Sequence, residues 1–184
     1  MTRMRYLTAE DLPDEHRALI ARNPGNLFRV LCHSPEGARQ FARMGAWIRS
    51  RSGVDARVRE MAILQVGYVS RSPYEWSHHV KIGREHGVSD EDVHAIVEES
   101  AGEVSSLAPS DRAVLRLARE MTVDGSGREE TLNEVLASLG ERDTMELVLA
   151  IAYYNLVVRV LATLDVDVEE SYRSYLGEFP LPEA

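Results

Sequence analysis

The feature that most constrains the fold is the frequent recurrence of helix start and stop signals, while signals for strands are scarce. Two Ser-Pro pairs, Ser34-Pro35 and Ser72-Pro73, place a favoured N-cap residue before a proline that helices accept at their first position. Gly53 follows the first of the segments that these pairs open, and glycine commonly ends a helix. We therefore expect an all-α domain of about seven or eight helices.

Helical spacing of the apolar residues and further caps give the expected segments. Asp55 and Ser89 are the other N-cap candidates, and Gly140 is a further stop. Short helical pieces are expected over 11–23 and 27–33, and longer helices over 35–52, 56–71, 73–86, 90–100, 110–123, 128–139 and 142–164. The tail is expected to end in Pro-rich coil. With no linker, repeat or low-complexity tract, we expect one domain over 1–184.

Composition and charge restrict the partners. Of the 184 residues, 44% are hydrophobic and 28% are charged, as in soluble globular proteins. The net charge of −9, without a basic run, argues against a nucleic-acid partner, because neutralising phosphates requires clustered Lys and Arg. The charge therefore favours partners other than nucleic acid.

The longest apolar stretch, residues 145–164, has the length of a membrane span. Glu146, Asn155 and Arg159 interrupt it, so we expect a buried helix or an interface between copies, and no membrane association. The first residues contain no apolar signal-peptide region. These features favour a cytoplasmic location.

Cys32 is the only cysteine, which excludes an intrachain disulfide, a cysteine-based zinc site and CxxC redox chemistry. A lone cysteine in a helical segment is most often a small buried hydrophobic residue.

The segment Ser72-Pro-Tyr-Glu75-Trp-Ser-His-His79 has two interpretations. Ser72 and Glu75 have the spacing of a capping box, in which each side chain accepts a hydrogen bond from the backbone amide of the other. Glu75 and His79 are also four residues apart and share a helix face, where a carboxylate orients an imidazole and raises its pKa. The first interpretation is structural, and the second indicates acid–base catalysis.

Other residues give the second interpretation its context. Glu60 stands directly before an apolar run, where a carboxylate needs a partner, and a helical hairpin brings it opposite His79. The alternative for Glu60 is a surface pair with Arg57. His78 points about 100° away from His79, so the two imidazoles do not easily serve one site. No HExxH motif is present, so we expect neither a metal nor a cofactor.

Residues 57–97, RVREMAILQVGYVSRSPYEWSHHVKIGREHGVSDEDVHAIV, resemble the core of the carboxymuconolactone decarboxylase and AhpD-like superfamily. The shared features are a Glu before an apolar helix, then Tyr-Glu-Trp-x-x-His, then Gly-Val-Ser and an acidic helix start. Residues 152–167 are more loosely similar to the final helix of longer members. The resemblance implies an AhpD-like helical fold, with a family core at about 36–120, that assembles as a homo-oligomer.

In the peroxidase branch of this superfamily a Glu, a CxxC pair and a His form the redox centre. The resemblance places these roles on Glu60, on Ser72 and Glu75 for the two cysteines, and on His79. Since neither cysteine position holds a thiol, a disulfide cycle is not expected. The decarboxylase branch carries Glu-x-x-x-His on this helix, which matches Glu75 and His79.

The resemblance thus implies a cofactor-free, decarboxylase-like lyase acting on a small carboxylated lactone or keto acid. His79 is expected to be the acid or base, Glu75 to orient it, and Glu60 to be a second acid–base group with a raised pKa. The expected substrate-binding residues are Arg71, Tyr74, Trp76, Tyr154 and Asn155. Two alternatives stay open: a non-catalytic binding or scaffold protein with this fold, and a peroxidase-like enzyme that uses Cys32.

Overall fold

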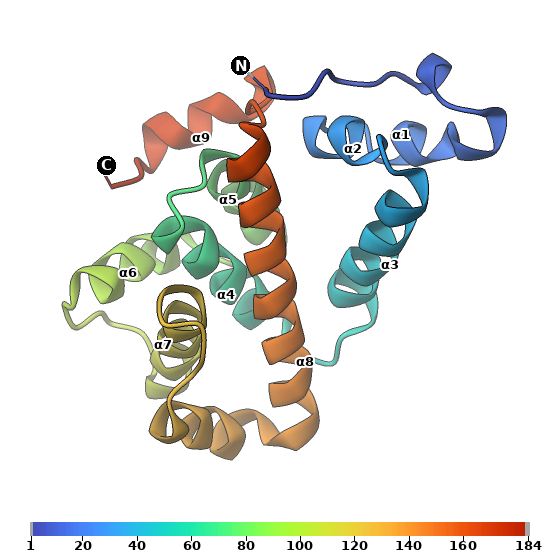
Figure 1. Cartoon of the computed structure of the whole chain (residues 1–184). Coiled ribbons are helices and arrows are strands. Elements are labelled where there is room, and N and C mark those ends of the chain that lie inside the picture. Colours follow the sequence, from blue (N-terminus) through green and yellow to red (C-terminus); the bar gives the residue numbers. More distant parts are fainter. Residues whose placement is uncertain (1, 183–184) are drawn as a thin grey trace.

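The computed structural model describes residues 2–182, which contain nine α-helices, three short 3-10 helices and no strand (Figure 1). The all-α expectation is therefore confirmed. The α-helices are α1 (Ala18–Arg22), α2 (Asn26–Leu31), α3 (Pro35–Arg51), α4 (Ala56–Val69), α5 (Pro73–Glu85), α6 (Asp90–Ala101), α7 (Pro109–Val123), α8 (Glu129–Leu164) and α9 (Arg173–Glu178).

Most helix boundaries follow the predicted signals. The side chains of Asp55, Ser72 and Ser89 each accept a hydrogen bond from an amide in the first turn of α4, α5 and α6. Gly140, at φ +77°, kinks α8 between the two helices predicted on either side of it. The tail forms α9, which was not expected, and residues 180–182 after it are coil, as expected. Trp76 Nε1 donates to the carbonyl of Phe179 at the end of α9.

Helix α4 is the central element of the core. It packs against α5, α6, α7 and α8, and every residue from Arg59 to Gly67 is buried. Its apolar run is therefore covered within one copy of the chain, which explains why the run is apolar on every face. This segment therefore gives no reason for self-association.

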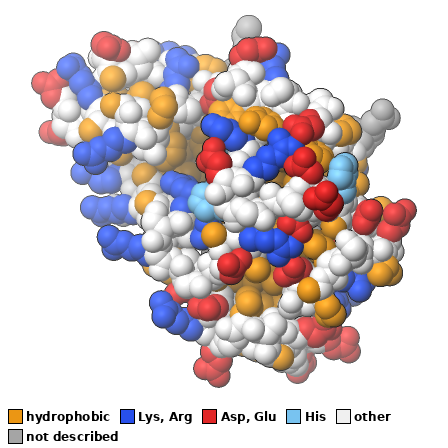
Figure 2. Space-filling model, turned by 180° about the vertical axis from the view of Figure 1, so that it is seen from behind, with side chains coloured by type: hydrophobic (Ala, Val, Ile, Leu, Met, Phe, Trp, Pro, Cys, Tyr) orange, Lys and Arg blue, Asp and Glu red, His pale blue; other side chains and the backbone are white. Residues whose placement is uncertain are grey.

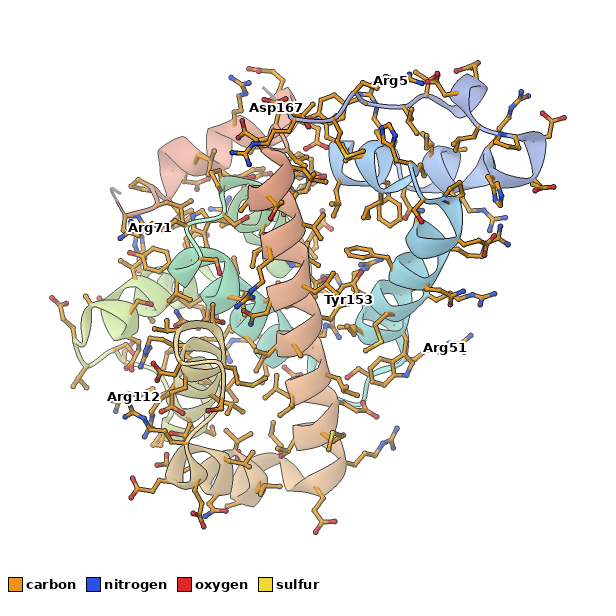
Figure 3. The ribbon with its side chains drawn as sticks, viewed as in Figure 1. Arg5, Arg51, Arg71, Arg112, Tyr153 and Asp167 are labelled. Atoms are coloured by element: carbon orange, nitrogen blue, oxygen red, sulfur yellow. The ribbon has the colours of Figure 1, made fainter. Side chains whose placement is uncertain are left out.

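Helix α8 separates the molecule into two parts in Figure 1: α4–α7 lie on one side, while α1–α3 lie on the other. The N-terminal segment returns to the end of α8, where the amide of Arg3 donates to the carbonyl of Leu164. Tyr153 projects from α8 towards α3 (Figure 3), and its hydroxyl donates to the carbonyl of Phe41 at 2.9 Å. The space between α3, α5 and α8 is where the candidate site lies.

Helix α8 alone, among the described residues, is long and apolar enough to be considered as a membrane span. Inside the fold, 44% of its most apolar window is buried. A stripe of exposed apolar side chains nevertheless runs along its outer face, at Met145, Leu149, Ala152 and Leu156.

Candidate functional site

His79 is held between two carboxylates. Its Nδ1 lies 2.6 Å from Oε2 of Glu60, and its Nε2 lies 3.0 Å from Oε1 of Glu75. All three side chains are buried, Glu60 completely. The predicted convergence of Glu60, Glu75 and His79 is confirmed as geometry. Helices α4 and α5 pack side by side, so Glu60, near the start of α4, lies opposite His79 in the second turn of α5.

Glu60 also has a second cationic partner. Arg59 is buried, and its Nε and Nη2 donate to Oε1 of Glu60 at 3.3 and 3.2 Å. The alternative pairing of Glu60 with Arg57 is wrong, because Arg57 binds Asp92 and Asp111 instead. The buried groups thus form one continuous chain of opposite charges, from Arg59 through Glu60 and His79 to Glu75.

These contacts determine how the groups ionise. Burial by itself lowers the pKa of His79, but the charges of Glu60 and Glu75 and their hydrogen bonds raise the pKa to about 9. Burial raises the pKa of Glu60, but the charge of His79, its hydrogen bond and Arg59 outweigh burial and hold the pKa below its usual value. The expected raised pKa of Glu60 is therefore wrong. At neutral pH His79 is an imidazolium that donates at both nitrogens.

The predicted capping box at the start of α5 is only half formed. The amide of Glu75 donates to Oγ of Ser72 at 3.4 Å, as expected of an N-cap. The amide of Ser72, however, donates to the carbonyl of Gly67 at 2.9 Å. Because that donor is already satisfied by the end of α4, the Glu75 carboxylate is free to reach His79.

Glu75 and His79 face a pocket of about 130 Å³ between α2, α3, α5 and α8. The walls are largely aromatic and come from all four helices: Phe28, Phe41, Tyr74, Tyr153 and Tyr154. The ring of Tyr154 lies edge-on to the imidazole of His79, with centroids 5.0 Å apart. Of the acidic pair, Glu75 lines the pocket and Glu60 lies behind His79.

Arg49 supplies positive charge to the same pocket. A Cβ built on Gly45, one turn earlier on α3, would lie 2.8 Å from the Tyr153 hydroxyl and 3.1 Å from Nη1 of Arg49. Gly45 therefore permits this close approach of α3 and α8. Burial raises the pKa of Tyr153 and Tyr154, and the charge of Arg49 partly offsets that effect. Both phenols are protonated donors at neutral pH.

Two of the five expected binding residues, Tyr74 and Tyr154, line the pocket, and three do not. Arg71 is exposed in the turn before α5, at φ +49°, and lies on the other side of α8 from Tyr153 in Figure 3. Trp76 is fully buried in the core under α9. Asn155 donates to Oγ1 of Thr122 and is held by Arg159, on a different face of α8 from Tyr154.

His78 and Cys32 have structural surroundings. His78 is stacked between Tyr74 and Tyr172, and its Nε2 lies 3.1 Å from Glu169. It borders the pocket, but both its nitrogens have partners within the chain. Cys32 is buried in an apolar cluster with Leu7 and Leu12, and burial raises the pKa of its thiol, which favours the unreactive form. Within residues 2–182, no cluster of His, Cys, Asp and Glu is arranged to hold a metal ion.

Arg49, Tyr153 and Phe41 belong to the pocket but were not expected there from the sequence. Each comes from a helix outside the 57–97 segment. The apolar and basic residues of these helices have the spacing of ordinary amphipathic helices, so the sequence gives no sign of a pocket there. The one local signal is Gly45, a helix-interior glycine that marks a close contact.

The described part of the chain has an AhpD-like helical fold. The family model for the carboxymuconolactone decarboxylase family matches residues 35–120. This match and the solved structures below support the resemblance of the chain to the carboxymuconolactone decarboxylase and AhpD-like superfamily. A comparison with curated proteins found no match.

Several solved structures share the fold at low sequence identity. A tribromopyrrole complex of a cysteine-to-alanine variant of the debrominase Bmp8 is 17% identical, with a TM-score of 0.81 over 97% of this chain and 100% of that one. The AhpD core, an uncharacterized peroxidase-related protein from Ralstonia eutropha JMP134, is 18% identical, with a TM-score of 0.76 over 95% of each chain. A peroxidase-related protein from Silicibacter sp. TM1040 is 20% identical, with a TM-score of 0.71 over 94% and 97%.

Proposed function

We propose that the chain is a cofactor-free acid–base enzyme of the decarboxylase type, acting on a small carboxylated lactone or keto acid. The observation that carries the proposal is the ring of His79, held between Glu60 and Glu75, with Glu75 facing an aromatic-lined pocket. Burying charged groups is costly even when they are paired, and pairs of acid–base groups in a cleft are a common mark of catalysis.

We assign the proton exchange with the substrate to Glu75, in place of the role expected for His79. Both nitrogens of His79 already face carboxylates, Nδ1 that of Glu60 and Nε2 that of Glu75, so Glu75 lies between the His79 proton and a ligand. In decarboxylation, the bond to the departing carboxylate breaks and its electron pair enters the conjugated system. His79 first passes its Nε2 proton to the Glu75 carboxylate, and the new carbanion-like carbon then takes that proton from Glu75. His79 regains a proton from solvent after CO₂ leaves.

Glu60 and Arg59 position the imidazole. Glu60 accepts the hydrogen bond from Nδ1–H of His79 and keeps the ring oriented, while Arg59 holds Glu60 ionised. Arg49 provides the positive charge that a carboxylated substrate requires at the same pocket.

The size of the pocket limits the substrate. Its volume of about 130 Å³ is close to the roughly 150 Å³ of a cavity that admits benzene. A single small ring, such as a γ-lactone, fits this limit and the aromatic walls. The debrominase Bmp8, which has the same fold, is described with a tribromopyrrole, which is also one flat ring.

We also propose that the chain forms a homo-oligomer in the cytoplasm. The support is the exposed stripe on α8 at Met145, Leu149, Ala152 and Leu156, whose spacing matches one helix face. Light scattering over micromolar concentrations measures this, and a monomer throughout would contradict it.

The test of the proposed function is CO₂ release from a panel of carboxylated γ-lactones and β-keto acids. We expect turnover by the wild type and loss of most of it in Glu75→Gln and His79→Ala, with circular dichroism unchanged. A wild type that turns over no member of the panel would favour the non-catalytic alternative. Turnover of an alkyl hydroperoxide with a dithiol, abolished by Cys32→Ser, would favour the peroxidase alternative.

A further inference from the structure

The pocket contains two successive tyrosines of α8 whose hydroxyl groups differ in their partners. Tyr153 and Tyr154 both line the pocket beside Glu75, and their rings are nearly perpendicular, with centroids 5.4 Å apart. The Tyr153 hydroxyl donates its proton to the carbonyl of Phe41 at 2.9 Å. The Tyr154 hydroxyl has no acceptor among residues 2–182, although the residue is only 3% exposed. Because a buried donor without an acceptor is costly, we expect a bound ligand to supply one.

Tyr154 lies between the acid–base groups and a positive charge. Its ring is edge-on to the imidazole of His79, with centroids 5.0 Å apart. Burial and then the charges of Glu75 and Glu60 raise the pKa of the Tyr154 phenol. The charge and contact of Arg49 lower that pKa, but by less. The phenol therefore keeps its proton at neutral pH and is close enough to interact with both Glu75 and Arg49.

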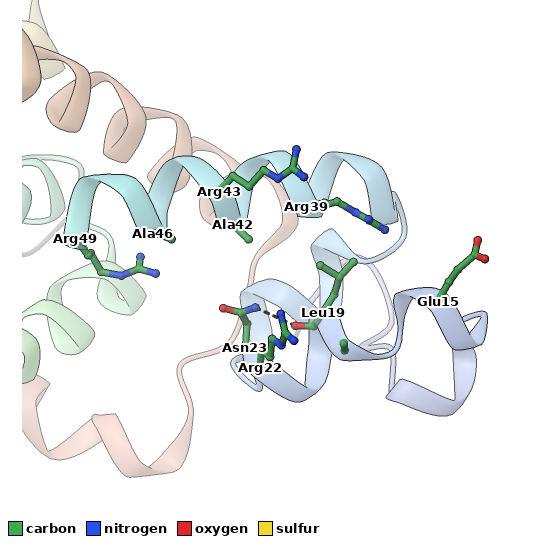
Figure 4. A pocket seen from close by; sticks show the side chains of 10 residues that line it. Glu15, Leu19, Arg22, Asn23, Arg39, Ala42, Arg43, Ala46 and Arg49 are labelled. Carbon is green, nitrogen blue, oxygen red and sulfur yellow. Dashed lines mark hydrogen bonds between the residues drawn. The ribbon is translucent and has the colours of Figure 1, made fainter. Parts of the chain in front are cut away.

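Arg49 brings the positive charge of α3 to this phenol. Its side chain extends from the last turn of that helix (Figure 4), which also carries Arg39, Arg43 and Arg51. Figure 2 shows basic side chains gathered along the left edge of that view, on the side of the molecule that α3 forms. The chain as a whole has a net charge of −9, so this helix supplies a local field of the opposite sign. A cation beside a phenol strengthens it as a hydrogen-bond donor and stabilises negative charge next to it.

The proposed decarboxylation needs a donor of this kind. When the bond to the departing carboxylate breaks, its electron pair moves through the conjugated system to the carbonyl oxygen, which becomes an enolate oxygen. Glu75 supplies the proton that the carbon takes, so the oxygen needs a different donor. A preorganised hydrogen bond to an oxygen on which negative charge develops is often the largest single contribution to the rate of an enzyme.

We infer that Tyr154 is a catalytic residue whose hydroxyl donates a hydrogen bond to the carbonyl oxygen of the substrate as CO₂ leaves. Arg49 polarises the phenol, and Tyr154 keeps its proton throughout, so the only proton that the substrate gains is the one that Glu75 delivers to carbon. Tyr153 does not take this role, because the carbonyl of Phe41 already accepts its proton. The inference rests on the proposed function and restricts its substrates to acids whose carbonyl group receives the electron pair of the breaking bond.

The experiment is calorimetric titration of the purified full chain with tetronate, a γ-lactone ring that is an enolate at neutral pH, and with neutral butenolide, which has the same ring. We expect the wild type to bind tetronate more tightly than butenolide. Tyr154→Phe should weaken tetronate roughly tenfold or more, the usual loss of a hydrogen bond to a charged group, and leave butenolide within about threefold. Tyr153→Phe is the matched comparison and should weaken tetronate less than about threefold, because its hydroxyl serves Phe41.

CO₂ release by Tyr154→Phe gives a second readout. We expect kcat to fall roughly 10²–10³-fold and KM to stay within about threefold, because the hydrogen bond strengthens only as charge develops on the oxygen. An unchanged kcat would overturn the inference, and so would a wild type that shows no preference for tetronate over butenolide. Tetronate binding that Arg49→Gln weakens and Tyr154→Phe does not would overturn it too, by showing that charge alone holds the anion.

The inference and the proposed function fail in different ways. If the wild type releases no CO₂ from any acid of the panel, but Tyr154→Phe still weakens tetronate selectively, the proposed function fails and the Tyr154 hydroxyl stands as the donor to an enolate oxygen. If the wild type releases CO₂ and Tyr154→Phe does so at the same rate, the proposed function stands and the inference fails.

Discussion

Two helices of this protein begin with the same pattern and use its acid in different ways. Ser72-Pro-Tyr-Glu75 opens α5 and Ser89-Asp-Glu-Asp92 opens α6. At Ser89 the capping box is complete: the serine accepts from the Asp92 amide at 3.1 Å, and Asp92 accepts from the Ser89 amide at 3.0 Å. At Ser72 the acid turns away to His79.

The difference lies in the amide of the N-cap residue. The Ser72 amide already donates to Gly67 at the end of α4, because the turn between α4 and α5 is short. The Ser89 amide has only Asp92 as an acceptor, and Asp92 is further held by Nε of Arg57 at 2.9 Å. Where the N-cap amide has no other acceptor, the acid three residues later caps the helix. Where that amide already has an acceptor, the acid is available for chemistry.

Replacing Glu75 by Asp, which gives the start of α5 the same cap and acid as the start of α6, should have the largest effect on the rate. Glu75→Asp shortens the side chain by one methylene, so the carboxylate no longer reaches His79, and the occupied Ser72 amide cannot hold it instead. We expect CO₂ release to fall on the order of 10²-fold or more, the usual loss for an acid–base group. The matched control, Asp92→Glu, should retain the rate. Equal losses in the two variants would show that the two acids play the same role.

Removing the charge behind His79 should have the next largest effect. Glu60→Gln leaves Arg59 and the imidazolium without their shared carboxylate in a fully buried position. We expect unfolding in urea to show a loss of about 3–5 kcal/mol, as for other broken buried ion pairs. A loss below about 1 kcal/mol would mean that the network is not held together by Glu60.

Removing the structural acid should affect stability and spare the chemistry. Asp92→Asn weakens the contact with Arg57 and the cap of α6. Because Arg57 keeps Asp111, we expect a loss of about 2 kcal/mol in urea unfolding, with CO₂ release unchanged. A rate loss comparable to that of Glu75→Asp would remove the distinction between the two helix starts.

The two N-cap serines should give the smallest effect. Ser72→Ala and Ser89→Ala each remove one side-chain acceptor, which typically costs about 1 kcal/mol. Thermal unfolding of both variants measures this. If only one of the two substitutions lowered the stability, the prediction that the two serines cap their helices equally well would be wrong.

The fold was more predictable from the sequence than the site. Capping residues such as Asp55 and glycines such as Gly140 act within a few residues, so the helix boundaries could be read locally. The convergence of Glu60 with His79 also followed from two successive helices. The fate of Glu75 could not be read, because it depends on which carbonyl the Ser72 amide contacts.

The remaining walls of the pocket depend on tertiary contacts between distant segments. Tyr153 and Arg49 meet only because α8 packs against α3 next to Gly45, and no local pattern specifies that pairing. For the same reason Trp76 and Asn155, which lie beside pocket residues in the sequence, point to other faces of their helices. Burial raises the pKa of Glu60, and the pKa is lowered first by the charge and hydrogen bond of His79 and then by Arg59, whose contact the sequence left undetermined.

The most direct measurement of the central claim is a ¹⁵N NMR titration of the His79 ring in the wild type, in Glu75→Gln and in Asp92→Asn. We expect protonation of both ring nitrogens at pH 7 and a pKa of about 9 for His79, with the pKa lowered in Glu75→Gln and unchanged in Asp92→Asn. Because this pKa lies above that of the unfolded chain, the stabilisation by His79 should be complete below about pH 6.5 and disappear as the pH rises through 9. A His79 that is neutral at pH 7, or whose pKa is the same in Glu75→Gln, would contradict the account.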